Sequence, residues 1–122
     1  MQWTFDAPDQ SEYAGQGNHG LSINDVDNDG YDEIVFAGLV LNNNGVPLAN
    51  THWGHGYAMH VSDWNGDGKL EVYKVNEEHW GAGVYDPATG EVLWFEEGSG
   101  DTGRGVAGDI DPRYEGAEMW HS

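Results

Sequence analysis

The sequence predicts an all-β fold made of four-stranded antiparallel blades of a β-propeller, with no substantial helix. An acidic loop recurs at residues 25–33, 63–71 and 109–118, and short segments rich in β-branched and aromatic residues flank each copy. Such segments, bounded by glycine and polar residues, are typical of strands. A hairpin follows each of the first two loops, so a unit has four strands in about 40 residues, the size of a propeller blade.

Two strands surround each acidic loop in this prediction. The predicted pairs are Leu21–Asn24 with Glu33–Ala37, Tyr57–Ser62 with Leu70–Val75, and Val106–Gly108 with Ala117–His121. His19 and His55 stand just before the first strand in their repeats, each next to a glycine. Because blades repeat one register, we expect these two histidines at the same rim of a central channel.

Hairpins complete the first two blades. Asn44-Gly45 is a strong turn signal, and Asp86–Gly90 has the composition of a turn. The predicted hairpin strands are Leu39–Leu41 with Val46–Leu48, and Gly83–Tyr85 with Glu91–Phe95.

Both ends of the chain are predicted to belong to incomplete blades. Gln2–Phe5 matches Leu93–Phe95, the last strand of a blade, and the chain ends after the second strand of another blade. The prediction is a single domain, residues 1–122, with about two and three-quarter blades of a larger ring. An open arc exposes sheet edges, through which the chain could form a homo-oligomer.

The first acidic loop has the ligands of a calcium site. Carboxylates occupy its positions 1, 3, 5 and 9, and Gly30 at position 6 permits a sharp turn. Calcium takes six to eight oxygen ligands. An EF-hand would need an acid at position 12, where the first two loops have Phe36 and Lys74. A metal-free turn remains the alternative. The predicted ligands are Asp25, Asp27, Asp29, Tyr31 through its carbonyl, and Glu33.

The second and third loops are variants of the first. Asn65 replaces the second acid of the second loop, and Arg113 occupies the fifth position of the third loop, whose closing acid moves to position 10. The predicted ligands of the second loop are Asp63, Asn65, Asp67, Lys69 and Glu71, and those of the third are Asp109, Asp111, Arg113 and Glu118.

The composition favours calcium as the partner. The net charge is −18, from 22 acidic residues against 4 Lys and Arg, while 12% aromatic residues indicate a packed fold. The chain has no cysteine, which excludes disulfides and thiolate metal sites. It also has no basic patch, no apolar run long enough to span a membrane and no signal peptide, so neither nucleic acid nor a membrane is expected as a partner.

Three long motifs, Gly17–Gly20, Gly54–His60 and Asp101–Tyr114, resemble those of the rhamnogalacturonan lyases of polysaccharide lyase family 11. The similarity runs from Trp3 to Trp120. The resemblance implies a calcium-rich propeller of eight blades, secreted by microbes that degrade pectin. It also implies β-elimination at the rhamnose–galacturonate bond of rhamnogalacturonan I. Because the chain covers only a fraction of a ring, we expect it to be inactive alone.

Eliminative cleavage requires a base near C5 of the uronate and a cation or donor at its carboxylate. His19 and His55 are the candidate catalytic residues, and the resemblance places both at a metal and substrate site. The alternative is a structural histidine pair. At Tyr57, two residues after the second histidine, relatives are expected to have an acid, and imidazoles without a carboxylate could accept a transition metal.

Arg104 and His60 are the candidate substrate-binding residues. Arg104 could bind a uronate carboxylate or pair with nearby acids, and His60 could line the channel or pack beneath a blade. Trp53 and Trp80 could stack on sugar rings if exposed, or pack between blades. Two functions remain open: a segment of a rhamnogalacturonan lyase, or a non-catalytic calcium-binding module that folds or self-associates on binding metal.

Overall fold

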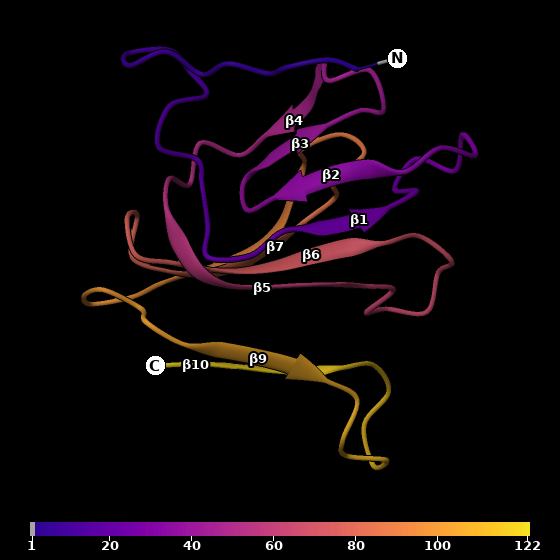
Figure 1. Cartoon of the computed structure of the whole chain (residues 1–122). Helices are drawn as coiled ribbons and strands as arrows, with labels where there is room; N and C mark the ends of the chain where they lie inside the picture. Colours follow the sequence, from indigo (N-terminus) through magenta and orange to yellow (C-terminus); the bar gives the residue numbers. More distant parts are fainter. Residues whose placement is uncertain (1) are drawn as a thin grey trace.

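The computed structural model describes residues 2–122 and contains three antiparallel β-sheets (Figure 1). The first sheet has β1 (Ser22–Asn24), β2 (Glu33–Phe36), β3 (Leu39–Leu41) and β4 (Pro47–Asn50); the second has β5 (Gly56–Ser62), β6 (Glu71–Asn76), β7 (Gly81–Tyr85) and β8 (Val92–Glu97); the third has β9 (Gly105–Gly108) and β10 (Glu118–His121). The described residues form no helix, so none is long and apolar enough to cross a lipid bilayer. The all-β prediction is confirmed.

The first two sheets have the same topology. Consecutive strands pair in the orders β1-β2-β3-β4 and β5-β6-β7-β8, and an irregularity interrupts the pairing of the third and fourth strands in both. The observed boundaries of the ten strands differ from the predicted ones by at most two residues. Strand β2, for example, ends before Ala37, because Ala37 has a φ of 60° and starts the turn into β3. The repeated meander is consistent with partial propeller blades.

The predicted strand at Gln2–Phe5 is wrong. These residues form no strand, so the described chain has ten strands and not the eleven that two and three-quarter blades require. An extended segment becomes a strand only where a neighbour completes its hydrogen bonds. Here Trp3 is held by its side chain, because its Nε1–H group donates to the carbonyl of Asn43 at 2.9 Å.

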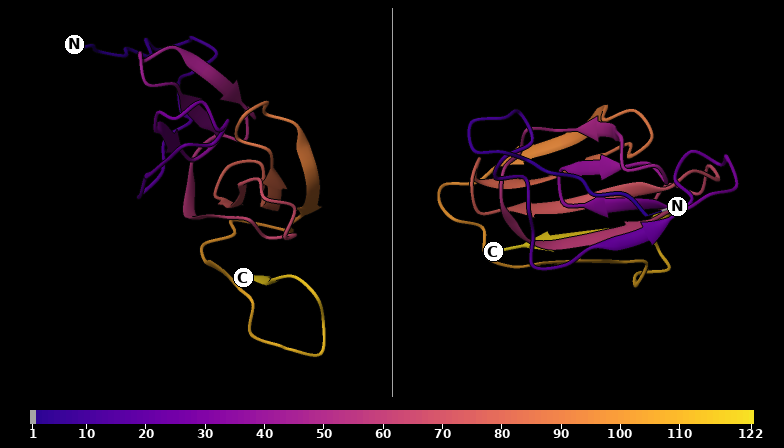
Figure 2. Two further views of the ribbon diagram at one scale, coloured as in Figure 1. Left: turned by 90° about the vertical axis from the view of Figure 1, so that its right-hand side faces the viewer. Right: turned by 45° about the horizontal axis from the view of Figure 1, so that its top comes forward.

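The three sheets stack on one another (Figures 1 and 2). They enclose two apolar clusters. Between the first and second sheets lie Val26, Val35, Val40, Ala49, Trp53, Val72 and Tyr85. The second cluster, Tyr73, Val75, Ala82 and Val84, contacts Ala107 and Met119 of the third sheet. The buried hydroxyl of Tyr85 donates to the carbonyl of Ala37 and links the first two sheets. The central sheet therefore contributes to both cores.

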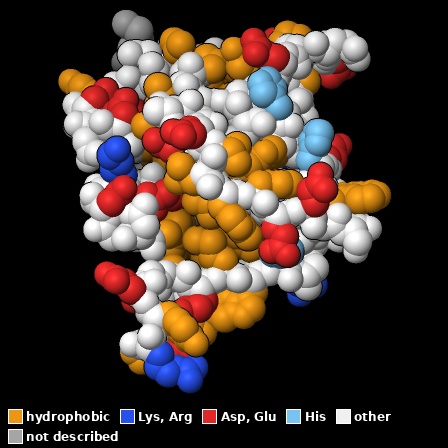
Figure 3. All heavy atoms as spheres, turned by 180° about the vertical axis from the view of Figure 1, so that it is seen from behind, with side chains coloured by type: hydrophobic (Ala, Val, Ile, Leu, Met, Phe, Trp, Pro, Cys, Tyr) orange, Lys and Arg blue, Asp and Glu red, His pale blue; other side chains and the backbone are white. Residues whose placement is uncertain are grey.

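One face of the molecule leaves apolar side chains exposed. Val84, Trp94, Met119 and Trp120 line a hollow of about 560 Å³ between the second and third sheets. Figure 3 shows hydrophobic side chains gathered in a hollow of the face opposite to that of Figure 1. The outer strand β8 is exposed at most positions. The second sheet is thus covered only in part by the two strands of the third.

The connections between strands divide the molecule into two ends. The acidic loops join the first to the second strand of each sheet and lie together at one end, on the right in Figure 1. The segments that lead into β1, β5 and β9 reach the opposite end, together with the β6–β7 turn. His19, His55 and Arg104 belong to these segments, so they lie at the end remote from the acidic loops.

A lysine is buried at the centre of the second sheet. Lys74 of β6 is 0% exposed, and its ammonium group donates to Oδ1 of Asn76. Burial lowers the pKa of Lys74 to about 8, and the nearby charge of Glu78 opposes this shift. Below this pKa the folded chain holds a charge in a dry environment, which destabilises it.

The buried lysine predicts a stability that rises in alkaline solution. Between pH 8 and the ordinary lysine pKa of 10.5 the unfolded chain binds more protons than the folded chain, so the free energy of unfolding increases with pH. Lys74→Met should remove about 2–3 kcal/mol of this increase, measured by urea unfolding between pH 7 and pH 10. Parallel pH profiles for the variant and the wild type would contradict a titrating Lys74.

Candidate functional site

The first acidic loop, between β1 and β2, folds around the carboxylate of Asp25. The backbone N–H groups of Asp29 and Gly30 donate to its two oxygens at 3.1 and 3.0 Å. Asp27 also accepts the N–H of Asp29, at 3.1 Å, while the N–H of Tyr31 donates to Asp29 at 2.8 Å. Gly30 has a φ of 91°, the conformation for which the sequence predicted a glycine. The turn brings the three aspartates to one centre.

Glu33 closes this loop from the first position of β2 and is completely buried. Its Oε2 atom accepts the N–H of Val26 at 3.0 Å, whereas Oε1 has no hydrogen-bond partner among the described residues. Burial, followed by the charges of Asp27, Asp29 and Asp25, raises the pKa of Glu33, although the Val26 bond opposes the shift. A buried, unpartnered carboxylate oxygen beside three aspartates fits a hard divalent cation.

The second acidic loop, between β5 and β6, has the same geometry. Backbone N–H groups of residues 66, 67 and 68 donate to Asp63 at distances between 2.7 and 3.1 Å. Asn65 accepts the N–H of Asp67 at 2.8 Å, and Asp67 accepts that of Lys69 at 2.9 Å. Glu71 is 4% exposed and accepts the backbone N–H of residue 64 at 2.8 Å. Burial is again the main cause that raises the pKa of Glu71.

The two loops provide groups of carboxylates that could hold a metal ion. In each group the ligand atoms lie within 4.8 Å of one another. The groups are Asp25, Asp27 and Asp29 in the first loop, and Asp63, Asp67 and Glu71 in the second.

The third acidic loop, between β9 and β10, differs from the other two. Glu118 closes it in the same way, since its Oε2 atom accepts the N–H groups of Ile110 and Asp111 at 3.0 and 3.1 Å. Asp111, however, pairs with the guanidinium of Arg113, whose Nε–H donates at 2.8 Å, and this bond lowers the pKa of Asp111. Asp109 is exposed at the start of the loop. Among the described residues this loop forms no group of three converging acidic ligands.

His19 and His55 meet at the opposite end of the sheets. Their Nε2 atoms are 3.3 Å apart, and Nε2 of His55 also lies 3.3 Å from a carboxylate oxygen of Glu77 in the β6–β7 turn. Gly54, next to His55, has a φ of 68°, and a side chain there would meet Glu78. The sequence thus positions two imidazoles and one carboxylate from three separate segments within contact distance.

Tyr57 connects this histidine pair to a neighbouring cavity. Its ring stacks on the His19 ring at a centroid distance of 5.1 Å and an interplanar angle of 5°. The charge of Glu77, followed by that of Asp101, raises the pKa of the Tyr57 hydroxyl. The raised pKa extends to higher pH the range in which the phenol is neutral and can donate a hydrogen bond.

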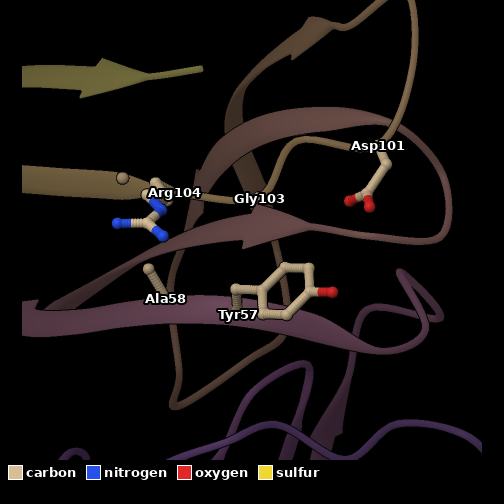
Figure 4. A pocket seen from close by; sticks show the side chains of 6 residues that line it. Tyr57, Ala58, Asp101, Gly103 and Arg104 are labelled. Carbon is tan, nitrogen blue, oxygen red and sulfur yellow. The ribbon is translucent and has the colours of Figure 1, made fainter.

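Arg104 lines the same cavity, which has a volume of about 640 Å³ (Figure 4). Tyr57 and Ala58 form one wall, and Asp101, Gly103 and Arg104 lie opposite them. Arg104 is exposed, and none of the ion pairs found among residues 2–122 involves it. The cavity thus presents one guanidinium and one carboxylate to a ligand.

His60 has a more structural environment. It lines the cleft between β5 and β9, but its Nε2 atom lies 3.4 Å from the carbonyl of Gly105, and its ring stacks on Tyr73 at 6.4 Å. The approach to Gly105 connects the second sheet to the third, whereas the Tyr73 contact lies within the second sheet.

Sequence reasoning did not assign Glu77 to the histidine pair. Glu77 lies in a turn next to Glu78, and no local spacing shows which of these two acids faces His55. The pairing follows from the β5–β6 register, because the N–H groups of both residues approach the carbonyl of His55, at 3.1 and 3.3 Å. The stacking of the Tyr57 ring on His19 was also not predicted, because it depends on the fold.

The fold and its two ends define a class: a repeat β-protein whose acidic loops lie at one end of its sheets and whose histidine–carboxylate site lies at the other. The chain belongs to rhamnogalacturonan lyase family 11. The model of the family's C-terminal domain matches residues 1–122.

Similar proteins agree with this family. The chain is 45% identical over 125 residues to the rhamnogalacturonan exolyase YesX of Bacillus subtilis, and 45% identical over 124 residues to the endolyase YesW of the same organism. The solved structure of a Bacillus licheniformis rhamnogalacturonan lyase matches 96% of the chain with a TM-score of 0.88 and 46% sequence identity. The matched part is 21% of that structure. The matches to YesX and YesW include 98% and 97% of the chain, but the chain spans only 20% of the length of each relative.

The Tyr57 environment can be tested by titration. Glu77→Gln should lower the pKa of Tyr57 toward its ordinary value of 10.0, because the charge of Glu77 is the largest cause of the shift. The measurement is the ring carbon resonance of ¹³C-labelled tyrosine, assigned with Tyr57→Phe. Glu78→Gln is the matched control and should leave the Tyr57 pKa unchanged. Equal changes of the Tyr57 pKa in the two variants would contradict a specific effect of the Glu77 charge on Tyr57.

Proposed function

We propose that this chain is a calcium-binding β-propeller segment of a rhamnogalacturonan I lyase. The observation that carries the proposal is the 3.3 Å approach of His19 to His55 beside a cavity lined by Arg104, in a chain of this lyase family. The complete enzyme would cleave the rhamnose–galacturonate bond by β-elimination. The chain would contribute one sector of a ring of eight blades, residues 1–122, and part of the substrate cleft.

Calcium is the ion that suits the first two acidic loops best. All their side-chain donors are oxygens, and the buried Oε1 atom of Glu33 lacks any other partner among the described residues. The net charge of −18 also favours binding of divalent cations. In the third loop, Arg113 already supplies a positive charge to Asp111, so we propose that calcium binds there more weakly than in the other two.

The chemistry at the opposite end would depend on groups of this chain. The guanidinium of Arg104 would pair with the uronate carboxylate and so favour the negative charge that develops when the C5 proton leaves. His19 or His55 would accept that proton, and the Glu77 carboxylate would orient His55. Alternatively, the histidines and Glu77 would hold a metal ion that stabilises the uronate carboxylate, and a group other than these imidazoles would then accept the proton. His60 would line the cleft.

Two further parts of the proposal concern the setting of the chain. Secretion of the parent protein follows from the substrate, a polysaccharide outside cells. The hollow beside Trp94 would be covered by neighbouring blades in a ring, or by a second copy of the chain if it self-associates.

The alternative function is a non-catalytic calcium-binding module. The metal-binding geometry of the loops supports it equally well, because it does not depend on the histidine site. The two functions differ in activity alone.

Calcium should stabilise the fold, and one substitution, Glu33→Gln, should change Tm in opposite directions with and without calcium. Glu33→Gln removes a buried charge, so it should raise Tm in EDTA by about 3–6 °C; with excess calcium it removes a ligand, so it should lower Tm by a similar amount. Circular dichroism melting curves provide the measurement. The control Asp32→Asn also removes one negative charge from this loop, but at an exposed position. It should therefore shift Tm in the same direction in EDTA and in calcium. An unchanged wild-type Tm after chelation would refute the calcium proposal.

Lyase activity distinguishes the two functions. With rhamnogalacturonan I, the isolated chain should give no rise in absorbance near ~235 nm, because an open arc positions substrate incompletely. The intact polypeptide that carries the chain should give this rise, and Arg104→Ala should lower its kcat/KM about 100-fold, with partial recovery in Arg104→Lys. Full activity of Arg104→Ala would remove Arg104 from the site, and an inactive intact polypeptide would favour the calcium-binding module.

A further inference from the structure

The β6–β7 turn, residues 77–80, places an exposed tryptophan at the same end of the molecule as the histidine pair. Trp80 is 53% exposed, although it lies between two strands that are buried at every position. Trp53, the other tryptophan with a potential role in sugar stacking, is 8% exposed and packs on Tyr85 and Phe95. The packing of the sheets therefore accounts for Trp53 and leaves the indole of Trp80 in solvent.

The backbone around Trp80 is fixed from both sides. The carbonyl of Trp80 accepts the N–H of Gly98 at 2.9 Å, and the carbonyl of His79 accepts the side-chain amide of Asn76 at 3.3 Å. His79 has a φ of 49°, a left-handed conformation that surrounding contacts must hold. A rigid backbone that presents an exposed indole is pre-organised for binding, because little freedom is lost when a ligand arrives.

Beside Trp80 lies a cavity of about 380 Å³, at the lower end of the size range of ligand pockets. Trp53, Phe95 and Trp80 give it an apolar wall, and His79 and Glu97 add polar groups. None of the four lysines and arginines of the chain lines it. The cavity thus offers an aromatic surface and a carboxylate that accepts hydrogen bonds, but no partner for an anion.

The turn also joins this cavity to the proposed reaction site. Glu77, at the first position of the turn, contacts His55, and Trp80, at the last position, lines the cavity. A polysaccharide that passes the histidine pair and continues outward across this end would meet Trp80 next. Its uronate units would be repelled by Glu97, whereas the hydroxyl groups of a neutral sugar could donate to it.

We propose that Trp80, His79 and Glu97 form a subsite for a neutral pyranose unit of the polysaccharide, which stacks on the Trp80 indole and donates a hydroxyl to Glu97. This inference rests on the proposed function for the identity of the polysaccharide. The subsite lies outside the cavity of Tyr57 and Arg104, and it would bind an outlying sugar without contacting the reacting atoms. It would lengthen the segment of polysaccharide that the protein holds.

The test uses the whole chain in calcium buffer and two probes of equal length, a rhamnogalacturonan I oligosaccharide with alternating neutral and charged units, and an oligogalacturonide with charged units only. Trp80→Ala should weaken binding of the first probe at least about ten-fold by NMR titration, as is usual when a stacked tryptophan is truncated. Trp80→Tyr keeps an aromatic surface and should retain most of the affinity. Trp120→Ala, which removes a comparably exposed indole on β10, should change the affinity less than about two-fold.

The possible outcomes are decisive. Equal affinities of wild type and Trp80→Ala, equal losses in Trp80→Ala and Trp120→Ala, or no binding of the first probe would overturn the subsite. A loss on Trp80→Ala that is as large for the oligogalacturonide would overturn its preference for a neutral sugar. None of these results would alter the response of the melting temperature to EDTA, so failure of the subsite and failure of the calcium-binding proposal are distinguishable.

Discussion

The structure depends on two buried glutamates that close the acidic loops. Glu33 and Glu71 begin the second strand of their sheets, and each binds the backbone N–H of the residue that follows the first aspartate of its loop. These bonds hold the first strand of each sheet against the second. They also bury a carboxylate among other carboxylates, which destabilises the fold without a compensating cation. The same residues that determine the connection between strands are therefore the ones that a bound cation would stabilise most.

The stacking of the sheets converts this local arrangement into a site at the other end. Because both four-stranded sheets are built alike, the segments that enter β1 and β5 emerge side by side, and a parallel bridge between Asn18 and Gly56 links them directly. This bridge lies next to His19 and His55 in the sequence. The short distance between the two imidazoles is thus a consequence of repeated topology, and the acidic loops connect the strands on which it depends.

Local patterns in the sequence were sufficient for the loops and most of the strands, because alternating carboxylates and turn residues act within a few positions of each other. Contacts between segments were not predictable in this way. Gln2–Phe5 has the composition of a strand but no strand to pair with among the described residues, and Glu77 and Glu78 are indistinguishable until the register of β5 and β6 is known. Lys74 entered the prediction only as a residue unsuited to an EF-hand, and its burial depends on the packing of sheets on both faces. The exposure of Trp80 and the burial of Trp53 have the same origin.

In the proposed function, the separation of the two ends limits what calcium in the acidic loops could do for substrate binding. Strand β5 has seven residues and extends about 20 Å, more than twice the Debye length of about 8 Å at physiological ionic strength. Positive charge bound in the acidic loops would therefore be largely screened at the histidine end, where Glu77, Glu78 and Asp101 would repel a polyanion. The attraction for a uronate would have to come from groups at that end, and Arg104 is the exposed cation there. A neutral sugar meets no such repulsion, which is why the acidic surface around Trp80 is compatible with binding a polysaccharide whose charged units alternate with neutral ones.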